Sequence, residues 1–257
     1  MVETVFWGVL SVGVSVALAV LGFAVARRLV PFDLREAQNS NTAVMFGALY
    51  VMYGLIVGFS AYLVSYQYDT AQKTAQGEAG SVEEIHRLAE GFPEKERREV
   101  QGLAESYAQA VVDEGWPLMR EGRTSARAGE TADDLRLGVV AFEPGTEREN
   151  ALYAQALTLV ENLDEYRGQR LLEVNEGIPS ILWVVLITGG AVTVVFTYLL
   201  GVSTERLHVA MIAAYTLVLA LILYTIRALD YPFDGLVQVG PEAFEAVLSR
   251  MESHAGR

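Results

Sequence analysis

Four long apolar runs constrain the fold of this 257-residue chain more than any other feature of its sequence. Each is long enough to cross a bilayer, which takes about 20 residues of helix, and none contains Asp, Glu, Lys or Arg. A helix in a soluble core would be shorter and would carry a charged face. The sequence therefore predicts four membrane helices, in residues 4–26, 43–64, 181–202 and 207–226.

A polar segment separates the second run from the third. Residues 67–179 hold 23 Asp and Glu against 12 Lys and Arg, a net charge of −11 that accounts for most of the −13 of the whole chain. Apolar residues recur in this segment at helical spacing, and the sequence shows no alternating strand pattern. Two capping sequences, Thr131 to Asp134 and Thr146 to Glu149, predict helix starts. We expect an acidic helical bundle.

The predicted fold is therefore all-α, with four transmembrane helices and a helical-bundle soluble domain inserted between the second and the third. The expected domains are residues 1–66 with the first two membrane helices, 67–179 with the acidic helical domain, 180–229 with the third and fourth membrane helices, and 230–257 with a C-terminal tail that contains a short amphipathic helix.

The charges beside the runs indicate an orientation. The loop after the first run carries Arg27, Arg28 and Arg35, so the positive-inside rule places it in the cytoplasm and the acidic domain outside. The chain uses Arg far more than Lys, which suggests a bacterial source. We expect an integral, multi-pass protein of the bacterial inner membrane.

The second run carries a stripe of small residues, and small residues also follow one face of the first and third runs. Such a face lets another helix backbone approach closely within one subunit. Alternatively, it lines a pore in an oligomer, where small residues expose backbone and hydroxyl groups to water. The second run is the pore candidate because it leads directly into the polar domain. Its stripe is Gly47, Val51, Gly54, Gly58, Ala61 and Ser65.

Several classes of protein do not fit the sequence. The acidic balance argues against a nucleic-acid partner, which needs clustered Lys and Arg. A proton-coupled transporter needs ionisable groups within the membrane, and the four runs lack carboxylates. The sequence has no P-loop, no G-x-S-x-G and no G-x-G-x-x-G, and it has no cysteine to form a thiolate metal site. We therefore expect neither an enzyme nor a bound cofactor or metal.

The segment IRALDYPFDG follows the fourth run. Pro232 disfavours helix at the residue before it, so we expect the fourth helix to end there. Tyr231 and Phe233 suit the interfacial belt of a membrane. The charged residues then belong either to an interface anchor with a chain reversal or to a pore mouth. These residues are Arg227, Asp230 and Asp234.

The same segment, read as LDYPFDG, resembles the signature of a bacterial membrane family of unknown function that is described as bestrophin-like. The resemblance extends over nearly the whole chain from residue 43. It includes HRLAEGFPEKERREVQGLAESYAQAVVDEGWPLM from His86, LWVVLITGGAVTVVFTYLLG from Leu182 and RLHVAMIAA from Arg206.

Bestrophins are pentameric, calcium-gated anion channels built from two helices, a helical insert, two more helices and a tail, with the second helix lining the pore. The resemblance therefore implies a homo-oligomer, with a pentamer as the family's form, that passes inorganic ions through the bilayer. It implies an aromatic neck at Tyr50, Tyr53 and Phe59, and it relates Asp230 and Asp234 to the acidic residues that bind calcium in bestrophins. It also implies a cytoplasmic insert, opposite to the orientation that the loop charges indicate.

The expected function is an oligomeric, bestrophin-like passive ion channel whose pore is lined by the second membrane helix. The resemblance implies anions, whereas an acidic vestibule would repel them and favour cations, so both selectivities stay open. The alternative is a non-conducting membrane sensor or scaffold whose helical domain binds a ligand or a partner.

Overall fold

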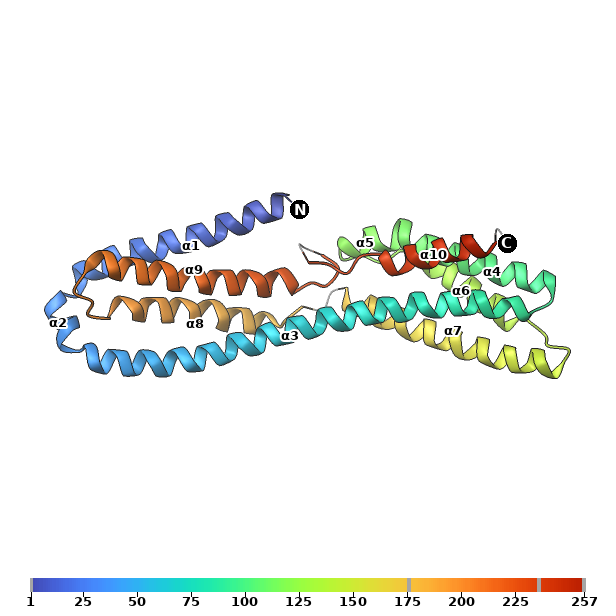
Figure 1. The fold of residues 1–257 in the computed structure, drawn as a ribbon, viewed down its shortest axis with the longest axis horizontal. Coiled ribbons are helices and arrows are strands. Elements are labelled where there is room, and N and C mark those ends of the chain that lie inside the picture. Colours follow the sequence, from blue (N-terminus) through green and yellow to red (C-terminus); the bar gives the residue numbers. More distant parts are fainter. Residues whose placement is uncertain (1, 175–176, 235–236, 256–257) are drawn as a thin grey trace. The chain divides into compact units, whose positions relative to one another are not determined.

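A computed structural model describes residues 2–174, 177–234 and 237–255. All regular elements in these ranges are helices, which confirms the predicted all-α class (Figure 1). The α-helices are α1 (Val2–Leu29), α2 (Phe32–Ala37), α3 (Asn39–Leu88), α4 (Glu94–Ala110), α5 (Trp116–Arg120), α6 (Ala126–Val140), α7 (Glu147–Glu173), α8 (Ser180–Tyr198), α9 (Glu205–Leu229) and α10 (Glu242–Ala255).

Four helices within these ranges are long and apolar enough to cross a membrane, namely α1, α3, α8 and α9. Each contains all or most of one predicted run. Helix α8 ends at Tyr198, before the predicted end at Val202. Beyond the helix end, the backbone N–H of Gly201 donates to the side chain of Asn39, at 3.0 Å. Helix α9 ends at Leu229, as the position of Pro232 predicts.

The chain divides into two compact units. The membrane-helix unit comprises Met1–Tyr66 and Gly177–Asp230, and the acidic unit comprises Gln67–Glu176 and Tyr231–Arg257. The boundary at Tyr66 lies inside α3, so this one helix contributes to both units.

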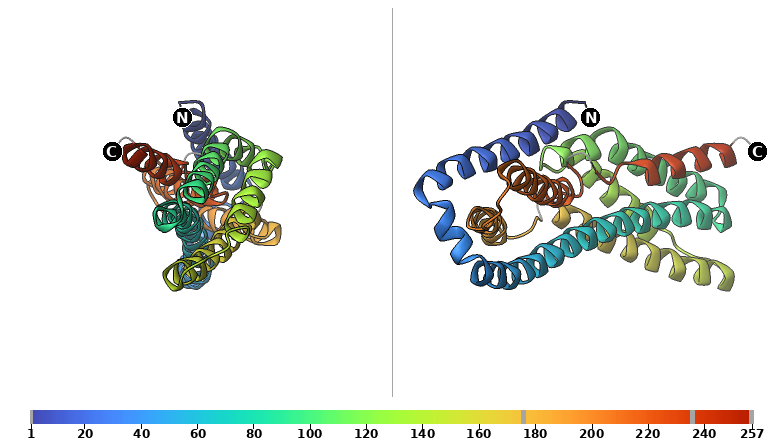
Figure 2. Two further views of the ribbon diagram at one scale, coloured as in Figure 1. Left: turned by 90° about the vertical axis from the view of Figure 1, so that its right-hand side faces the viewer. Right: turned by 60° about the vertical axis from the view of Figure 1, so that its left-hand side comes forward.

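Helices α1 and α9 of the membrane-helix unit run antiparallel. Arg27 near the end of α1 forms an ion pair with Glu205 at the start of α9, while Gly8 near the start of α1 faces Tyr224 near the end of α9. The short α2 turns the chain from α1 into α3 (Figure 2). Helix α8 contacts both α1 and α9.

Two clusters of buried side chains hold these helices together. In one, Phe23 of α1 packs against Tyr198 of α8 and Ile212 of α9. In the other, Tyr53 of α3 packs against Leu186 of α8. Lipid is as apolar as these side chains, so close van der Waals packing and hydrogen bonds, rather than escape from water, favour such contacts in a bilayer.

The acidic unit has one continuous core, to which α3, α4, α5, α6, α7 and α10 all contribute. Aromatic rings fill much of it. Phe92 stacks on Phe142 with ring centroids 4.2 Å apart, and Trp116 packs against Phe244 at 5.7 Å. Phe233 is 1% exposed and packs in the same core, so the expectation that it anchors the chain at a membrane interface is wrong.

The two predicted helix starts have different outcomes. At Thr146, the side chain accepts a hydrogen bond from the N–H of Glu149, and the Glu149 side chain accepts one from the N–H of Thr146. This capping box confirms the predicted start of α7. Thr131 instead lies within α6, whose N-cap is Ser125, and its hydroxyl donates to the carbonyl of Arg127. The start predicted at Thr131 is wrong because a threonine inside a helix can bond to the preceding turn.

Candidate functional site

Helix α3 turns one face toward α8 and α9. The hydroxyl of Tyr53 donates a hydrogen bond to the carbonyl oxygen of Leu186, at 2.8 Å. The Ser60 hydroxyl donates to the carbonyl of Ile56 in the same helix, at 2.9 Å. This buried face therefore satisfies its polar groups without water. Its buried residues, at helical spacing, are Tyr53, Val57, Ser60 and Val64.

The small-residue stripe lies on a different face of α3. At about 100° per residue, its middle is roughly a third of a turn from the buried face. A Cβ atom added at each of its three glycines would meet no atom within 4 Å among the described residues. Val51 is 70% exposed, whereas Ala61, at the edge of the stripe, packs against the Tyr53 cluster. The full stripe is Gly47, Val51, Gly54, Gly58, Ala61 and Ser65.

The glycines on the small faces of α1 and α8 have different surroundings. A Cβ atom at Gly8 would lie 2.3 Å from the ring of Tyr224, and one at Gly22 would lie 2.8 Å from the hydroxyl of Tyr198. A Cβ atom at Gly190, on the small face of α8, would lie 3.0 Å from the hydroxyl of Tyr53. These glycines make room for tyrosine side chains of the same subunit. Among the described residues, the small face of α3 is therefore the one whose glycines meet no side chain of their own subunit.

Large side chains lie beside the open stripe. Phe59, Tyr62 and Tyr66 of α3 are 61%, 66% and 58% exposed, and the rings of Tyr62 and Tyr66 stack with centroids 6.3 Å apart. Tyr50 is 52% exposed, whereas Tyr53 is 5% exposed and belongs to the inner face. Of the three aromatic residues that the resemblance relates to a bestrophin neck, Tyr53 is thus turned into its own subunit.

Asp230 links the ends of two helices in the membrane-helix unit. Its side chain is 2% exposed, and one carboxylate oxygen accepts a hydrogen bond from the N–H of Ile178, at 2.8 Å. The other oxygen accepts one from the indole N–H of Trp183, at 3.0 Å. Asp230 follows α9, and its two donors lie where the chain enters α8. The carboxylate therefore ties the end of α9 to the start of α8.

Arg227 and Asp234 are exposed, unlike Asp230. Arg227 lies in the last turn of α9, where a cation interacts favourably with the helix carbonyls. Asp234 belongs to the acidic unit. The three charged residues of the segment thus differ in burial and in the unit to which they belong.

The acidic unit buries a cluster of charge that sequence patterns did not reveal. Arg170 of α7 donates two hydrogen bonds to the carboxylate of Glu78 of α3, at 2.5 and 2.8 Å. The hydroxyl of Tyr107 donates to the same carboxylate, and the guanidinium group lies 5.2 Å from the ring of Trp116. Glu78 and Arg170 are 0% and 2% exposed. They lie far apart in the sequence, so no local motif could have identified the pair.

The surroundings of this cluster shift two of its pKa values. Burial raises the pKa of the Tyr107 phenol, and the neighbouring Glu78 carboxylate raises it further. Burial alone would lower the pKa of Arg170, but the charge and hydrogen bonds of Glu78 outweigh that effect and raise it. Tyr107 is therefore a neutral donor and Arg170 a permanent cation. All strong donors and acceptors are used among these groups, which is typical of a structural network.

A search of curated protein sequences gives no match to this chain. Solved structures with a similar fold include two variants of a bacterial bestrophin homologue from Klebsiella pneumoniae. The first has a TM-score of 0.67 at 11% identity, with 96% of this chain and 100% of that chain covered. The second has a TM-score of 0.71 at 10% identity, with 99% and 100% covered. A third structure, described as a membrane protein, has a TM-score of 0.71 at 10% identity, with 95% and 98% covered.

The fold is thus shared with these proteins, although sequence identity to them is low. Four helices suited to a membrane, in the part of the chain that the structure describes, agree with that likeness. Residues 13–244 also match the family model described as the bestrophin-like domain. The match spans most of the sequence, and the chain is an integral membrane protein that belongs to the bestrophin-like family.

Proposed function

We propose that this protein is a subunit of a passive ion channel that several copies of the chain form together. Four membrane helices from one subunit are too few to enclose an aqueous pore. The path for ions would therefore lie on the axis of the oligomer. The residues facing that axis would be the stripe Gly47, Val51, Gly54, Gly58, Ala61 and Ser65 of α3.

The observation that carries this proposal is the contrast among the glycines on the small faces of the membrane helices. Gly8, Gly22 and Gly190 are packed against tyrosine side chains, whereas Gly54 and Gly58 have open space beside them among the described residues. When small residues on a membrane helix contact nothing in their own subunit, we expect their face either to contact another subunit or to line a water-filled pore. Membership of the bestrophin-like family supports the second possibility.

The proposed topology follows the predicted domains. The chain crosses the bacterial inner membrane four times, and residues 67–179 form an acidic helical domain outside the bilayer, between the second and third crossings. The family resemblance makes a homopentamer the arrangement to test first. Inorganic ions are the proposed cargo, without a bound cofactor. The net charge of −11 in residues 67–179 would attract cations to a vestibule, so anion selectivity requires basic or backbone groups at the narrow part of the path.

The charged residues after the fourth crossing fit an interface between membrane and water. Asp230 is occupied by two hydrogen-bond donors, so we assign it to holding α8 and α9 together. Arg227 is exposed in the last turn of α9, and we assign it to the membrane surface. Asp234 is exposed and stays a candidate for the mouth of the path.

The test compares two matched glycine substitutions in the purified full chain. Gly54→Leu places a bulky side chain on the open stripe of α3, and Gly13→Leu does the same on α1, where a Cβ atom also meets no described atom within 4 Å. Ion flux is measured in planar bilayers with chloride and potassium gradients, and the oligomeric state is measured by native mass spectrometry. We expect Gly54→Leu to reduce flux at least tenfold in an intact oligomer, and Gly13→Leu to leave flux unchanged.

Two results would contradict the pore assignment. If Gly54→Leu dissociates the oligomer, the stripe is a contact between subunits. If both variants conduct like the unmodified protein, the stripe faces lipid. Discrete conductance of the unmodified protein, with a shifted reversal potential, would give the selectivity in the same recordings.

A second candidate is a non-conducting membrane sensor or scaffold. A cavity of about 600 Å³ between α3 and α10 of the acidic unit favours it. Polar side chains such as Gln72, Gln76 and Glu242 line this cavity, and the buried amide oxygen of Gln238 has no hydrogen-bond partner among the described residues. Absence of conductance from an intact oligomer would favour this candidate over the channel.

A further inference from the structure

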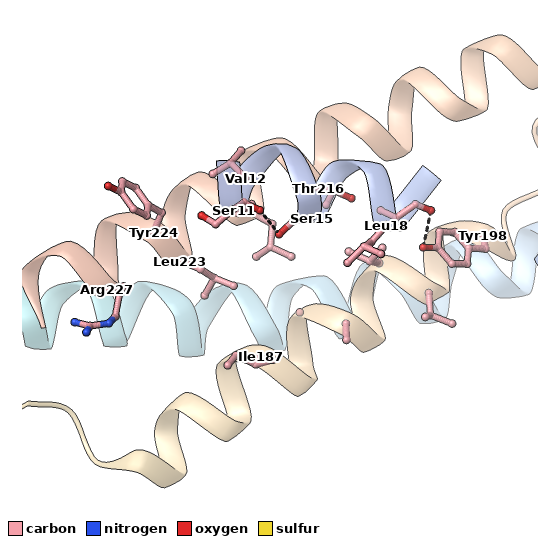
Figure 3. A pocket seen from close by; sticks show the side chains of 17 residues that line it. Ser11, Val12, Ser15, Leu18, Ile187, Tyr198, Thr216, Leu223, Tyr224 and Arg227 are labelled. Atoms are coloured by element: carbon pink, nitrogen blue, oxygen red, sulfur yellow. Dashed lines mark hydrogen bonds between the residues drawn. The ribbon is translucent and has the colours of Figure 1, made fainter. Parts of the chain in front are cut away.

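A cavity of about 590 Å³ lies among α1, α8 and α9 of the membrane-helix unit (Figure 3). Its walls are mainly aliphatic side chains, and Leu18 and Val195 on its lining are 62% and 52% exposed. The cavity is therefore a crevice that opens at the surface of the unit. In a bilayer that surface meets lipid.

Most hydroxyl groups in the walls are hydrogen-bonded to backbone carbonyls, so the crevice is largely apolar. The hydroxyls of Ser11 and Ser15 donate to carbonyl oxygens of their own helix, both at 2.8 Å. The hydroxyl of Tyr198 donates across to the carbonyl of Ala19, at 2.8 Å. Between the two ends, the buried hydroxyl of Thr216 has no partner among the described residues. Among the described residues that line the crevice, Arg227 is the one that carries a charge.

The crevice has a charged end. Figure 3 shows Arg227 at one end and Tyr198 at the other. At 1.5 Å per residue, Thr216 and Arg227 are about 16 Å apart along α9. That length is close to one leaflet of a bilayer whose hydrocarbon core is about 30 Å thick. An object that fills the crevice would therefore be apolar over the depth of a leaflet and would meet a guanidinium group at the membrane surface.

We propose that the crevice binds one acyl chain of an anionic phospholipid, with the lipid phosphate at Arg227. The length of the crevice and the positive charge at its end both match this occupant. The aliphatic walls lose van der Waals contacts if they face empty space, and a lipid chain restores those contacts. A guanidinium group offers parallel N–H donors to phosphate oxygens. The proposal depends on insertion in a membrane and not on ion conduction, so it can fail or hold independently of the channel.

The test measures lipid binding to the purified full chain in detergent, by native mass spectrometry at increasing lipid concentration. The probes are dioleoylphosphatidylglycerol, which is anionic, and dioleoylphosphatidylcholine, which is zwitterionic. We expect the anionic lipid to bind the unmodified protein at least tenfold more tightly. Arg227→Gln should remove most of that preference, about tenfold, because one charge-assisted contact is lost.

Two further variants test the apolar part of the site. Ala220→Leu fills the crevice from α9, and we expect it to weaken binding of both lipids. Ala210→Leu is its matched control on an exposed position of the same helix, and Arg206→Gln is the control for loss of an exposed arginine. Neither control should change lipid binding.

Three outcomes would overturn the proposal. Equal binding of the two lipids to the unmodified protein would exclude recognition of the anionic group. Unchanged binding to both Arg227→Gln and Ala220→Leu would exclude the crevice as the site. A change of oligomeric state in Ala220→Leu, without loss of lipid, would show that another copy of the chain fills the crevice. Thermal unfolding of each variant without lipid identifies any variant that fails to fold, and Arg227→Gln still tests the proposal in that case.

Discussion

The two units of the molecule place their buried charge differently. The acidic unit buries Glu78 and Arg170 against each other between long helices. In the membrane-helix unit, the buried carboxylate and guanidinium groups among the described residues are Asp230 and Arg35, and both lie at helix ends. Asp230 accepts from a backbone N–H and an indole, and Arg35 donates to the carbonyl of Tyr198, at 3.3 Å.

The difference reflects the solvent that surrounds each unit. In the middle of a bilayer, a charged side chain has no water to solvate it, so charges there are expensive and rare. At helix ends, a charge also satisfies backbone groups that the helix leaves without partners. A unit surrounded by water can tolerate a central ion pair, provided that every lone pair and proton finds a partner. The predictions below test how strongly each unit depends on its own arrangement.

The largest effect is expected for Arg170→Ala in the acidic unit. The substitution leaves Glu78 buried without its cation, and breaking such a pair typically costs about 3–5 kcal/mol of the free energy of unfolding. Chemical unfolding of the full chain in detergent, followed by tryptophan fluorescence, measures the loss. The control is Arg123→Ala, which removes an exposed ion pair with Glu121 and should change stability by less than about 1 kcal/mol. Equal effects of the two substitutions would show that the buried pair contributes no more to the free energy of unfolding than the exposed pair.

A smaller effect is expected for Asp230→Ala in the membrane-helix unit. The N–H of Ile178 and the indole N–H of Trp183 lose their acceptor, and a buried donor without a partner costs about 1–3 kcal/mol. The control is Asp234→Ala, because Asp234 is exposed. Thermal unfolding of both variants in the same detergent measures the difference. A similar loss of stability in the two would contradict the role of Asp230 in tying α9 to α8.

The smallest effect is expected for Thr146→Ala at the start of α7. Loss of this N-cap should destabilise the acidic unit by about 1 kcal/mol, because the N–H of Glu149 loses its acceptor. Thr158→Ala, within the same helix and exposed, is the matched control and should be neutral or slightly stabilising. Urea unfolding monitored by circular dichroism compares the two. The comparison of these two variants shows whether a helix cap contributes to the stability of a unit that also has a large packed core.

Predictions from the sequence were most accurate for features that depend on residues close together in the chain. Length and the absence of charge identified the four membrane helices, and the spacing of Thr146 and Glu149 identified the start of α7. The same local rule failed at Thr131, where the start of the helix lies earlier, at Ser125. The rule that aromatic residues beside a membrane helix lie at the interface failed at Phe233, because such a residue can enter a protein core as readily as a membrane interface.

The sequence by itself determined the helical class, the membrane helices and the family resemblance, because apolar run length and helical periodicity are properties of short segments. Tertiary structure decided which small faces are filled. Gly190 and Gly54 look alike in sequence, and the side chain of Tyr53 packs against the first and not the second. Tertiary structure also paired Glu78 with Arg170 and Asp230 with Trp183. Such contacts depend on how distant segments meet, and no periodicity in the chain encodes the partner of a single side chain.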